Sequence, residues 1–84
     1  MATVVVYSTG NCPYCRMAKE LLTARGIPFE EIRIDLDTTQ REEMIRLTHK
    51  RTVPQILINR KSVGGYDDLT ILVKSGKFDE LLNH

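Results

Sequence analysis

The apolar residues of the chain group into short runs and alternations that are typical of β-strands. Residues 4–7 form a β-branched run, VVVY, which suits a buried strand. Residues 29–34 alternate charged with apolar side chains and predict a second strand, and residues 55–59, QILIN, predict a third. Residues 59–61 predict a tight turn that leads into a short fourth strand over residues 62–65.

Between these strands, apolar residues recur at the three- and four-residue spacing of amphipathic helices. The first predicted helix begins near Pro13 and ends before Gly26, and its apolar positions are Met17, Ala18, Leu21 and Leu22. The second helix is capped by Asp37 or Thr38 and continues through Thr48. Its inward-facing residues are expected to be Met44, Ile45 and Leu47.

The third predicted helix is capped by Asp67 or Asp68 and continues through residues 69–73, and a short final helix covers residues 78–82. The element order is therefore β-α-β-α-β-β-α. A strand–helix–strand start implies a crossover with parallel pairing, and the short connection between the last two strands implies an antiparallel hairpin. The sequence predicts a single α/β domain over residues 1–84, a small mixed four-stranded sheet flanked by helices. Core residues are expected to include Tyr7, Met17, Phe29, Met44 and Phe78.

The overall charge is close to balanced, which narrows the classes of partner. Twelve basic and eleven acidic residues give a formal net charge of +1, so we expect neither nucleic acid nor an anionic membrane as a partner. No apolar run approaches the ~20 residues of a membrane span, and residues 1–7 lack the basic region and the length of a signal peptide. We therefore expect a soluble, cytoplasmic protein, in a compartment where ordinary thiols are kept reduced.

The chain contains two cysteines, Cys12 and Cys15, and three uses for them can be compared. A structural disulfide between them would close a very short loop, and cross-linking stabilises least when the loop is short. A closed zinc site needs four ligands, but only His49 and His84 are available to complete it, and neither has a ligand spacing. The third use is a redox-active dithiol.

The predicted elements favour the dithiol, because they place Cys12 at the N-terminus of the first helix. The free N–H groups and the dipole of a helix N-terminus stabilise a thiolate, which is the reactive form of cysteine. Cys15 lies three positions later on the same helical face, within the separation that a disulfide needs. Pro13 stiffens the turn between the two cysteines. Reversible disulfide formation, with Cys12 as the outer sulfur, is the interpretation that follows.

Three motifs extend this interpretation: CPYC at residues 12–15, TVP at residues 52–54 and GGYDDL at residues 64–69. In this order and spacing they resemble the dithiol glutaredoxins of the short bacterial type, over essentially the whole chain. The resemblance implies a thioredoxin-like fold and a glutathione-dependent oxidoreductase that reduces protein disulfides and protein–glutathione mixed disulfides. It further implies that Cys12 is the nucleophile and Cys15 the resolving thiol. No metal and no tightly bound cofactor are expected, and glutathione is the co-substrate.

The same resemblance implies a glutathione site and a cis peptide bond between Val53 and Pro54. The cysteinyl unit of glutathione would pair with the backbone of Val53 like an added strand, and Arg41 would contact the glycyl carboxylate. The implied glutathione-binding residues are Tyr14, Arg41, Thr52, Val53, Pro54, Gly65, Tyr66, Asp67 and Asp68. Two positions depart from the common family pattern: Thr9 replaces a frequent Lys, and Tyr66 replaces a residue that is commonly small.

Two other functions are compatible with the dithiol. One is a glutaredoxin-like electron donor to ribonucleotide reductase that thioredoxin reductase recycles, although such proteins tend to lack charged glutathione-binding positions such as Arg41, Asp67 and Asp68. The other is an iron–sulfur carrier in which two chains and two glutathiones hold a cluster through Cys12, an assembly that Pro13 disfavours in the family. The expected partners are glutathione and disulfide-containing or glutathionylated proteins, including ribonucleotide reductase, and we expect a monomer.

Overall fold

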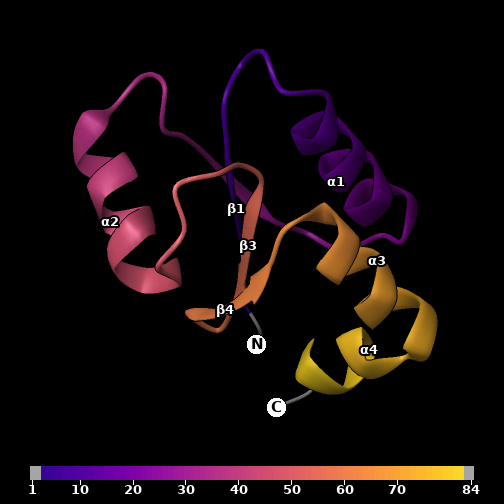
Figure 1. The fold of residues 1–84 in the computed structure, drawn as a ribbon. Coiled ribbons are helices and arrows are strands. Elements are labelled where there is room, and N and C mark those ends of the chain that lie inside the picture. The colour runs from indigo at the N-terminus through magenta and orange to yellow at the C-terminus, as the bar shows by residue number, and fades with distance from the viewer. Residues whose placement is uncertain (1–2, 83–84) are drawn as a thin grey trace.

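The computed structural model describes residues 3–82 and folds them into one four-stranded sheet with helices on both faces (Figure 1). The strands are β1 (Val4–Ser8), β2 (Glu30–Arg33), β3 (Gln55–Ile58) and β4 (Lys61–Gly64). The helices are α1 (Pro13–Ala24), α2 (Thr38–Thr48), α3 (Tyr66–Ser75) and α4 (Lys77–Leu82). The predicted element order is confirmed. None of the helices in the described range is both long enough and apolar enough to cross a membrane.

The sheet is mixed, with the spatial strand order β2-β1-β3-β4. Strand β1 pairs in parallel with β2 and antiparallel with β3, and β4 pairs antiparallel with β3, as predicted. The connection between β3 and β4 turns through Asn59 and Arg60, whose φ angles of 52° and 69° are both left-handed, as tight hairpin turns with the twist of the sheet require. Because β1 and β3 are neighbouring antiparallel strands, the C-terminal end of β1 and the N-terminal end of β3 lie side by side.

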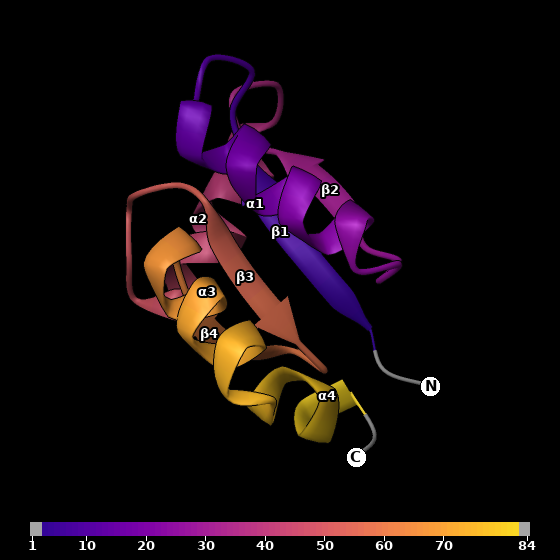
Figure 2. The ribbon, with the colours of Figure 1, turned by 90° about the vertical axis from the view of Figure 1, so that its right-hand side faces the viewer.

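The helices form two unequal layers around the sheet. Helix α2 covers one face, and α1, α3 and α4 cover the other (Figures 1 and 2). Strand β3 is buried on both sides because its side chains alternate between the layers. Ile56 and Ile58 join the cluster beneath α1, α3 and α4, whereas Leu57 packs in a second cluster with Met44 of α2.

The core predictions hold with one exception. Tyr7, Met44 and Phe78 are buried, and Phe29 is partly buried against the larger cluster. Met17 is 42% exposed, so its placement in the core was wrong. The buried stripe of α1 consists of Cys15, Ala18 and Leu22, at i, i+3 and i+7, and Met17 lies beside this stripe rather than on it.

A polar cluster ties α1 to two strands of the sheet. The carboxylate of Glu31 on β2 accepts a hydrogen bond from the hydroxyl of Ser8 at 2.6 Å and pairs with the ammonium group of Lys19 on α1, also at 2.6 Å. The contact with Lys19 has the larger effect and that with Ser8 the smaller, and together they hold the pKa of Glu31 below its ordinary value. Ser8 is buried, so the carboxylate satisfies a hydroxyl that has left water.

Candidate functional site

Cys12 forms the start of α1. It is the N-cap residue, with extended backbone angles, and Pro13 occupies the first helical position. The sulfur of Cys12 accepts a hydrogen bond from the backbone N–H of Cys15 at 3.1 Å. A sulfur in this position lies among the unpaired N–H groups of the first helical turn, which favour negative charge. The predicted placement of Cys12 at a helix N-terminus is confirmed.

The two thiols have different surroundings. Both are unpaired, but Cys12 is half-buried and Cys15 is only 1% exposed. Burial, followed by the hydrogen bond to Cys12, raises the pKa of Cys15 to about 12. Cys15 therefore stays protonated at neutral pH, because removal of its proton would place a charge in an apolar environment. The arrangement gives one accessible sulfur and one concealed sulfur, three residues apart on the same helix.

An ion pair anchors the loop that leads from β1 to Cys12. The carboxylate of Asp35 accepts a hydrogen bond from the backbone N–H of Gly10 at 3.1 Å and two from Arg33, at 2.7 and 2.8 Å. The hydrogen bonds from Arg33, which have the larger effect, and the one from Gly10 hold the pKa of Asp35 well below its usual range. The charged, planar Arg33–Asp35 pair fixes a backbone position two residues before the N-cap.

The TVP motif at residues 52–54, directly before β3, contacts Cys12. The peptide bond between Val53 and Pro54 is cis, as expected. The carbonyl oxygen of Val53 lies 3.7 Å from the sulfur of Cys12, which donates to it. Tyr7 pairs with Gln55 in the β1–β3 ladder, so the end of β1 and the residues before β3 are held side by side. Residues 41 positions apart in sequence thus meet at the sulfur.

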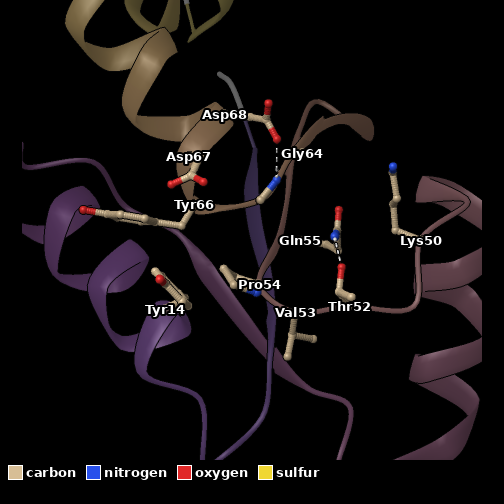
Figure 3. A pocket seen from close by; sticks show the side chains of 11 residues that line it. Tyr14, Lys50, Thr52, Val53, Pro54, Gln55, Gly64, Tyr66, Asp67 and Asp68 are labelled. Atoms are coloured by element: carbon tan, nitrogen blue, oxygen red, sulfur yellow. Dashed lines mark hydrogen bonds between the residues drawn. The ribbon is translucent and has the colours of Figure 1, made fainter.

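A pocket of about 390 Å³ opens beside this junction (Figure 3). Its walls come from the first turn of α1, the segment before β3, and the junction of β4 with α3. The lining residues are Tyr14, Lys50, Thr52, Val53, Pro54, Gln55, Gly64, Gly65, Tyr66, Asp67 and Asp68. The rings of Tyr14 and Tyr66 face each other across one side, with centroids 6.0 Å apart and planes inclined by 39°. The pocket therefore has aromatic, backbone and acidic walls.

The start of α3 differs from the prediction. Gly65 is the N-cap and the helix begins at Tyr66, so neither Asp67 nor Asp68 is the cap. Asp68 instead reaches back from the third helical position and accepts a hydrogen bond from the N–H of Gly65 at 3.1 Å. A β-carbon at Gly65 would lie only 3.3 Å from the carbonyl oxygen of Pro54. A glycine here allows β4 and α3 to approach the segment before β3 closely.

The pocket brings together every predicted glutathione-binding residue except Arg41. Tyr14, Thr52, Val53, Pro54, Gly65, Tyr66, Asp67 and Asp68 all line it. Arg41 is exposed in the first turn of α2 and does not line this pocket.

Comparison with known proteins assigns the family. The glutaredoxin family model matches residues 4–63. The chain belongs to the glutaredoxin family. It is 46% identical over 82 residues to glutaredoxin 3 of Escherichia coli K12, covering 98% of this chain and 99% of that protein. It is 47% identical over 83 residues to a glutaredoxin of Pseudomonas aeruginosa, covering 99% of each.

Solved structures agree with the family assignment. The solution structure of glutaredoxin from Brucella melitensis is 43% identical, with a TM-score of 0.83 and coverage of 98% of this chain and 89% of that chain. A crystal structure of a buckwheat glutaredoxin–glutathione complex is 28% identical, with a TM-score of 0.86 and coverage of 98% and 77%. The thioredoxin-like fold is thus confirmed, and the chain is a glutathione-dependent thiol–disulfide oxidoreductase.

Sequence reasoning missed part of this glutaredoxin site. Lys50, Gln55 and Gly64 line the pocket but were not among the predicted site residues, and the anchoring of Gly10 by Asp35 was not predicted. Lys50 belongs to a short basic run that also suits a solvated helix end. Of these residues, only Gln55 had a recognisable signal in the sequence: it is an amide directly after Pro54, at the start of an otherwise apolar strand.

Proposed function

We propose that Cys12 is the nucleophile and Cys15 the resolving thiol of this oxidoreductase. The observation that carries the proposal is the asymmetry of the pair: the sulfur of Cys12 is half-buried at a helix N-terminus, whereas Cys15 is buried and its pKa is raised to about 12. Thiolates attack disulfides and thiols do not. The first attack therefore belongs to Cys12, and Cys15 acts only on the intermediate that Cys12 has formed.

Deglutathionylation then needs Cys12 alone. Its thiolate attacks the glutathione sulfur of a protein–glutathione mixed disulfide, a bond forms between Cys12 and glutathione, and the protein leaves as a thiolate that takes up a proton. A glutathione thiolate next attacks the glutathione sulfur held on Cys12. Oxidised glutathione leaves, and the Cys12 thiolate is restored. Each cycle consumes one free glutathione, and the oxidised glutathione that leaves combines it with the glutathionyl unit removed from the protein.

Reduction of a protein disulfide uses both cysteines. The thiolate of Cys12 attacks one substrate sulfur, forms a mixed disulfide with it and releases the other substrate sulfur as a thiolate. Cys15 loses its proton and attacks the sulfur of Cys12, which closes the Cys12–Cys15 disulfide and releases the reduced protein. Two glutathione molecules then return the pair to the dithiol through one mixed disulfide.

The pocket supplies complementary groups for glutathione. The backbone of Val53 offers strand-like pairing to the cysteinyl unit, and the N-terminus of α3 with Asp67 and Asp68 offers N–H groups and carboxylates to the γ-glutamyl carboxylate and ammonium groups. The binding set that we propose is Tyr14, Arg41, Thr52, Val53, Pro54, Gly65, Tyr66, Asp67 and Asp68. The similarity to a glutaredoxin solved with glutathione supports this assignment. Arg41, outside the pocket, is assigned to the glycyl carboxylate by resemblance alone.

The proposed setting is a cytoplasmic monomer that acts on glutathionylated or disulfide-containing proteins, ribonucleotide reductase among them. The near-neutral charge of +1 supports a partner range set by disulfide chemistry and not by long-range electrostatic attraction.

The test is the reduction of a glutathionylated peptide, with glutathione and glutathione reductase, by the wild type and two variants. Cys12→Ser should lose activity by at least 1,000-fold, since a serine hydroxyl does not exchange with disulfides, on the scale expected for removal of a nucleophile. Cys15→Ser should keep deglutathionylation within about threefold of wild type but should lose reduction of a protein disulfide. An inactive Cys15→Ser alongside an active Cys12→Ser would reverse the assigned roles.

A further inference from the structure

A buried amide lies in the wall of the pocket, at the first position of β3. Gln55 is 3% exposed, and its Nε2 donates to the hydroxyl oxygen of Thr52 at 3.3 Å. Its Oε1 is enclosed and has no hydrogen-bond partner within residues 3–82. Buried side-chain oxygens in folded proteins are nearly always paired, and an unpaired one is costly because it has given up its water. Such an oxygen beside a ligand pocket points to a donor on the ligand.

The orientation of the amide agrees with a role in the pocket. Figure 3 shows the Gln55 oxygen turned away from Thr52, toward the space between Gly64 and Lys50. All four residues line the same pocket. The last torsion of a glutamine side chain is broad, so rotation of the amide can present Oε1 to a bound molecule.

The register of the sheet indicates which part of glutathione is nearest. Ile56 pairs with Gly64, so Gln55 lies next to the junction of β4 with α3. That junction is where the proposed function places the γ-glutamyl group. The ammonium group at this end carries three N–H donors. Asp67 and Asp68 line the same pocket, and one oxygen of Asp68 already accepts from the N–H of Gly65. Gln55 Oε1 offers this ammonium group an additional acceptor beside the two carboxylates.

We propose that Gln55 is a specificity-determining residue for glutathione and that its Oε1 accepts a hydrogen bond from the γ-glutamyl ammonium group. The inference rests on the proposed function, since it requires glutathione to occupy this pocket. A site that holds a buried acceptor rejects an analogue lacking the donor, because the acceptor is then left unpaired. Gln55 thus selects the γ-glutamyl amine and disfavours thiol peptides that have no ammonium group there.

The experiment compares two substrates and three variants. The substrates are one peptide as a mixed disulfide with glutathione and the same peptide with des-amino-glutathione, in which hydrogen replaces the ammonium group. Gln55→Met removes the acceptor, Gln55→Glu keeps an oxygen at the same place, and Gln40→Met changes the chain's other glutamine, which lies on α2 outside the pocket. KM and kcat are measured for each pair, and thermal melting confirms folding.

We expect Gln55→Met to raise KM for the glutathione substrate about tenfold, to change kcat less than twofold, and to leave the des-amino substrate unaffected. Gln55→Glu should retain the preference for the ammonium group, and Gln40→Met should match wild type. Equal losses on both substrates in Gln55→Met would show a merely structural role and overturn the proposal, as would an unchanged preference for glutathione. If Gln55→Met does not fold, loss of the preference in Gln55→Glu overturns it. Absence of any turnover of the glutathionylated peptide by the wild type would instead refute the proposed function, and this inference with it.

Discussion

At the scale of single residues, burial separates two chemically identical thiols. Cys12 and Cys15 sit in the same helical turn, yet only Cys15 lies in the apolar layer beneath α1, beside Ala18 and Leu22 in the buried stripe. On the roles proposed above, the raised pKa of Cys15 keeps the free dithiol from reacting through the resolving thiol. It also makes removal of the Cys15 proton a requirement of the resolving step, because the attacking species must be a thiolate.

This separation predicts how the reduced protein reacts with iodoacetamide. Because the pKa of Cys15 is raised to about 12, its thiolate fraction stays very small from pH 6 to 9 and grows only as the pH approaches 12. One equivalent of label should add rapidly in that range, on Cys12. Peptide mass spectrometry checks the site, and Cys12→Ser should label at least 100-fold more slowly than Cys15→Ser. Rapid addition of two equivalents at pH 8 would contradict the burial argument.

At the scale of elements, two neighbouring carboxylates at the start of α3 line the pocket, and one of them also has a structural role. The carboxylate of Asp68 accepts a hydrogen bond from the N–H of Gly65, the N-cap of α3. Within the described residues, the side chain of Asp67 makes no hydrogen bond to the start of the helix. Acidic side chains in a first helical turn are favourable in general, but only a specific hydrogen bond fixes the backbone.

Substitution by alanine should separate these roles. Asp68→Ala removes the acceptor for the Gly65 N–H and should lower the free energy of unfolding by about 1 kcal/mol, in addition to raising KM for glutathione. Asp67→Ala serves as the matched variant and should raise KM while changing stability by less than about 0.5 kcal/mol. Urea denaturation and the glutathione assay check the pair. Equal destabilisation by both substitutions would show that the hydrogen bond of Asp68 has no special role.

The Glu31 cluster predicts a pH-dependent stability between α1 and the sheet. A carboxyl whose pKa is lowered on folding stabilises the protein above its ordinary pKa of 4.5, and the contribution disappears as the pH falls through the lowered folded value. Glu31→Gln should therefore lower stability by about 1 kcal/mol at pH 7, a decrease of roughly 4–8 °C in Tm. The difference from wild type should shrink steadily below about pH 4.5. Melting curves at pH 7, 5 and 3 test this, and a difference that is constant across the series would exclude the charge as its cause.

At the scale of the whole molecule, the last helix is held in the core by the buried Phe78, with Leu81 and Leu82 packed against the same cluster. Helix α4 has six residues, and Phe78, 1% exposed, packs in the cluster that includes Val6, Leu22 and Leu69. Such a short helix has little stability of its own, so its position depends on these core contacts, of which that of Phe78 is the most buried.

Phe78→Ala should accordingly cost about 3–5 kcal/mol, a large share of the roughly 5–15 kcal/mol that holds a domain folded. Leu36→Ala is the matched control, since Leu36 is 75% exposed and its truncation should change stability by less than about 0.5 kcal/mol. Urea unfolding followed by circular dichroism measures both. A cost below about 1 kcal/mol at Phe78 would mean that α4 contributes little to the fold.

The fold could be predicted from sequence because its elements obey simple periods. Burial of one or both faces of a strand gives a recognisable apolar pattern, which is how the strands at residues 4–7 and 55–58 were predicted. Asp37, one of the two predicted caps of α2, is a residue type that favours helix starts. Met17 was misplaced because a helical stripe can be drawn through either of two neighbouring apolar positions. The cap of α3 was misassigned because Gly65 has no side chain to signal it. The contact of Asp35 with Gly10 and the place of Gln55 in a pocket formed by several segments depend on tertiary structure, which periodicity does not encode.

The position of Cys12 has a further consequence for how selection acts on this chain. Serine is among the best N-cap residues, so Cys12→Ser should leave α1 at least as well formed as it is in the wild type. The most favourable residue for the helix and the required residue for the chemistry are therefore different at one position. With Cys12 as the proposed nucleophile and N-cap of α1, the chain carries a thiol where a serine would be the stronger cap.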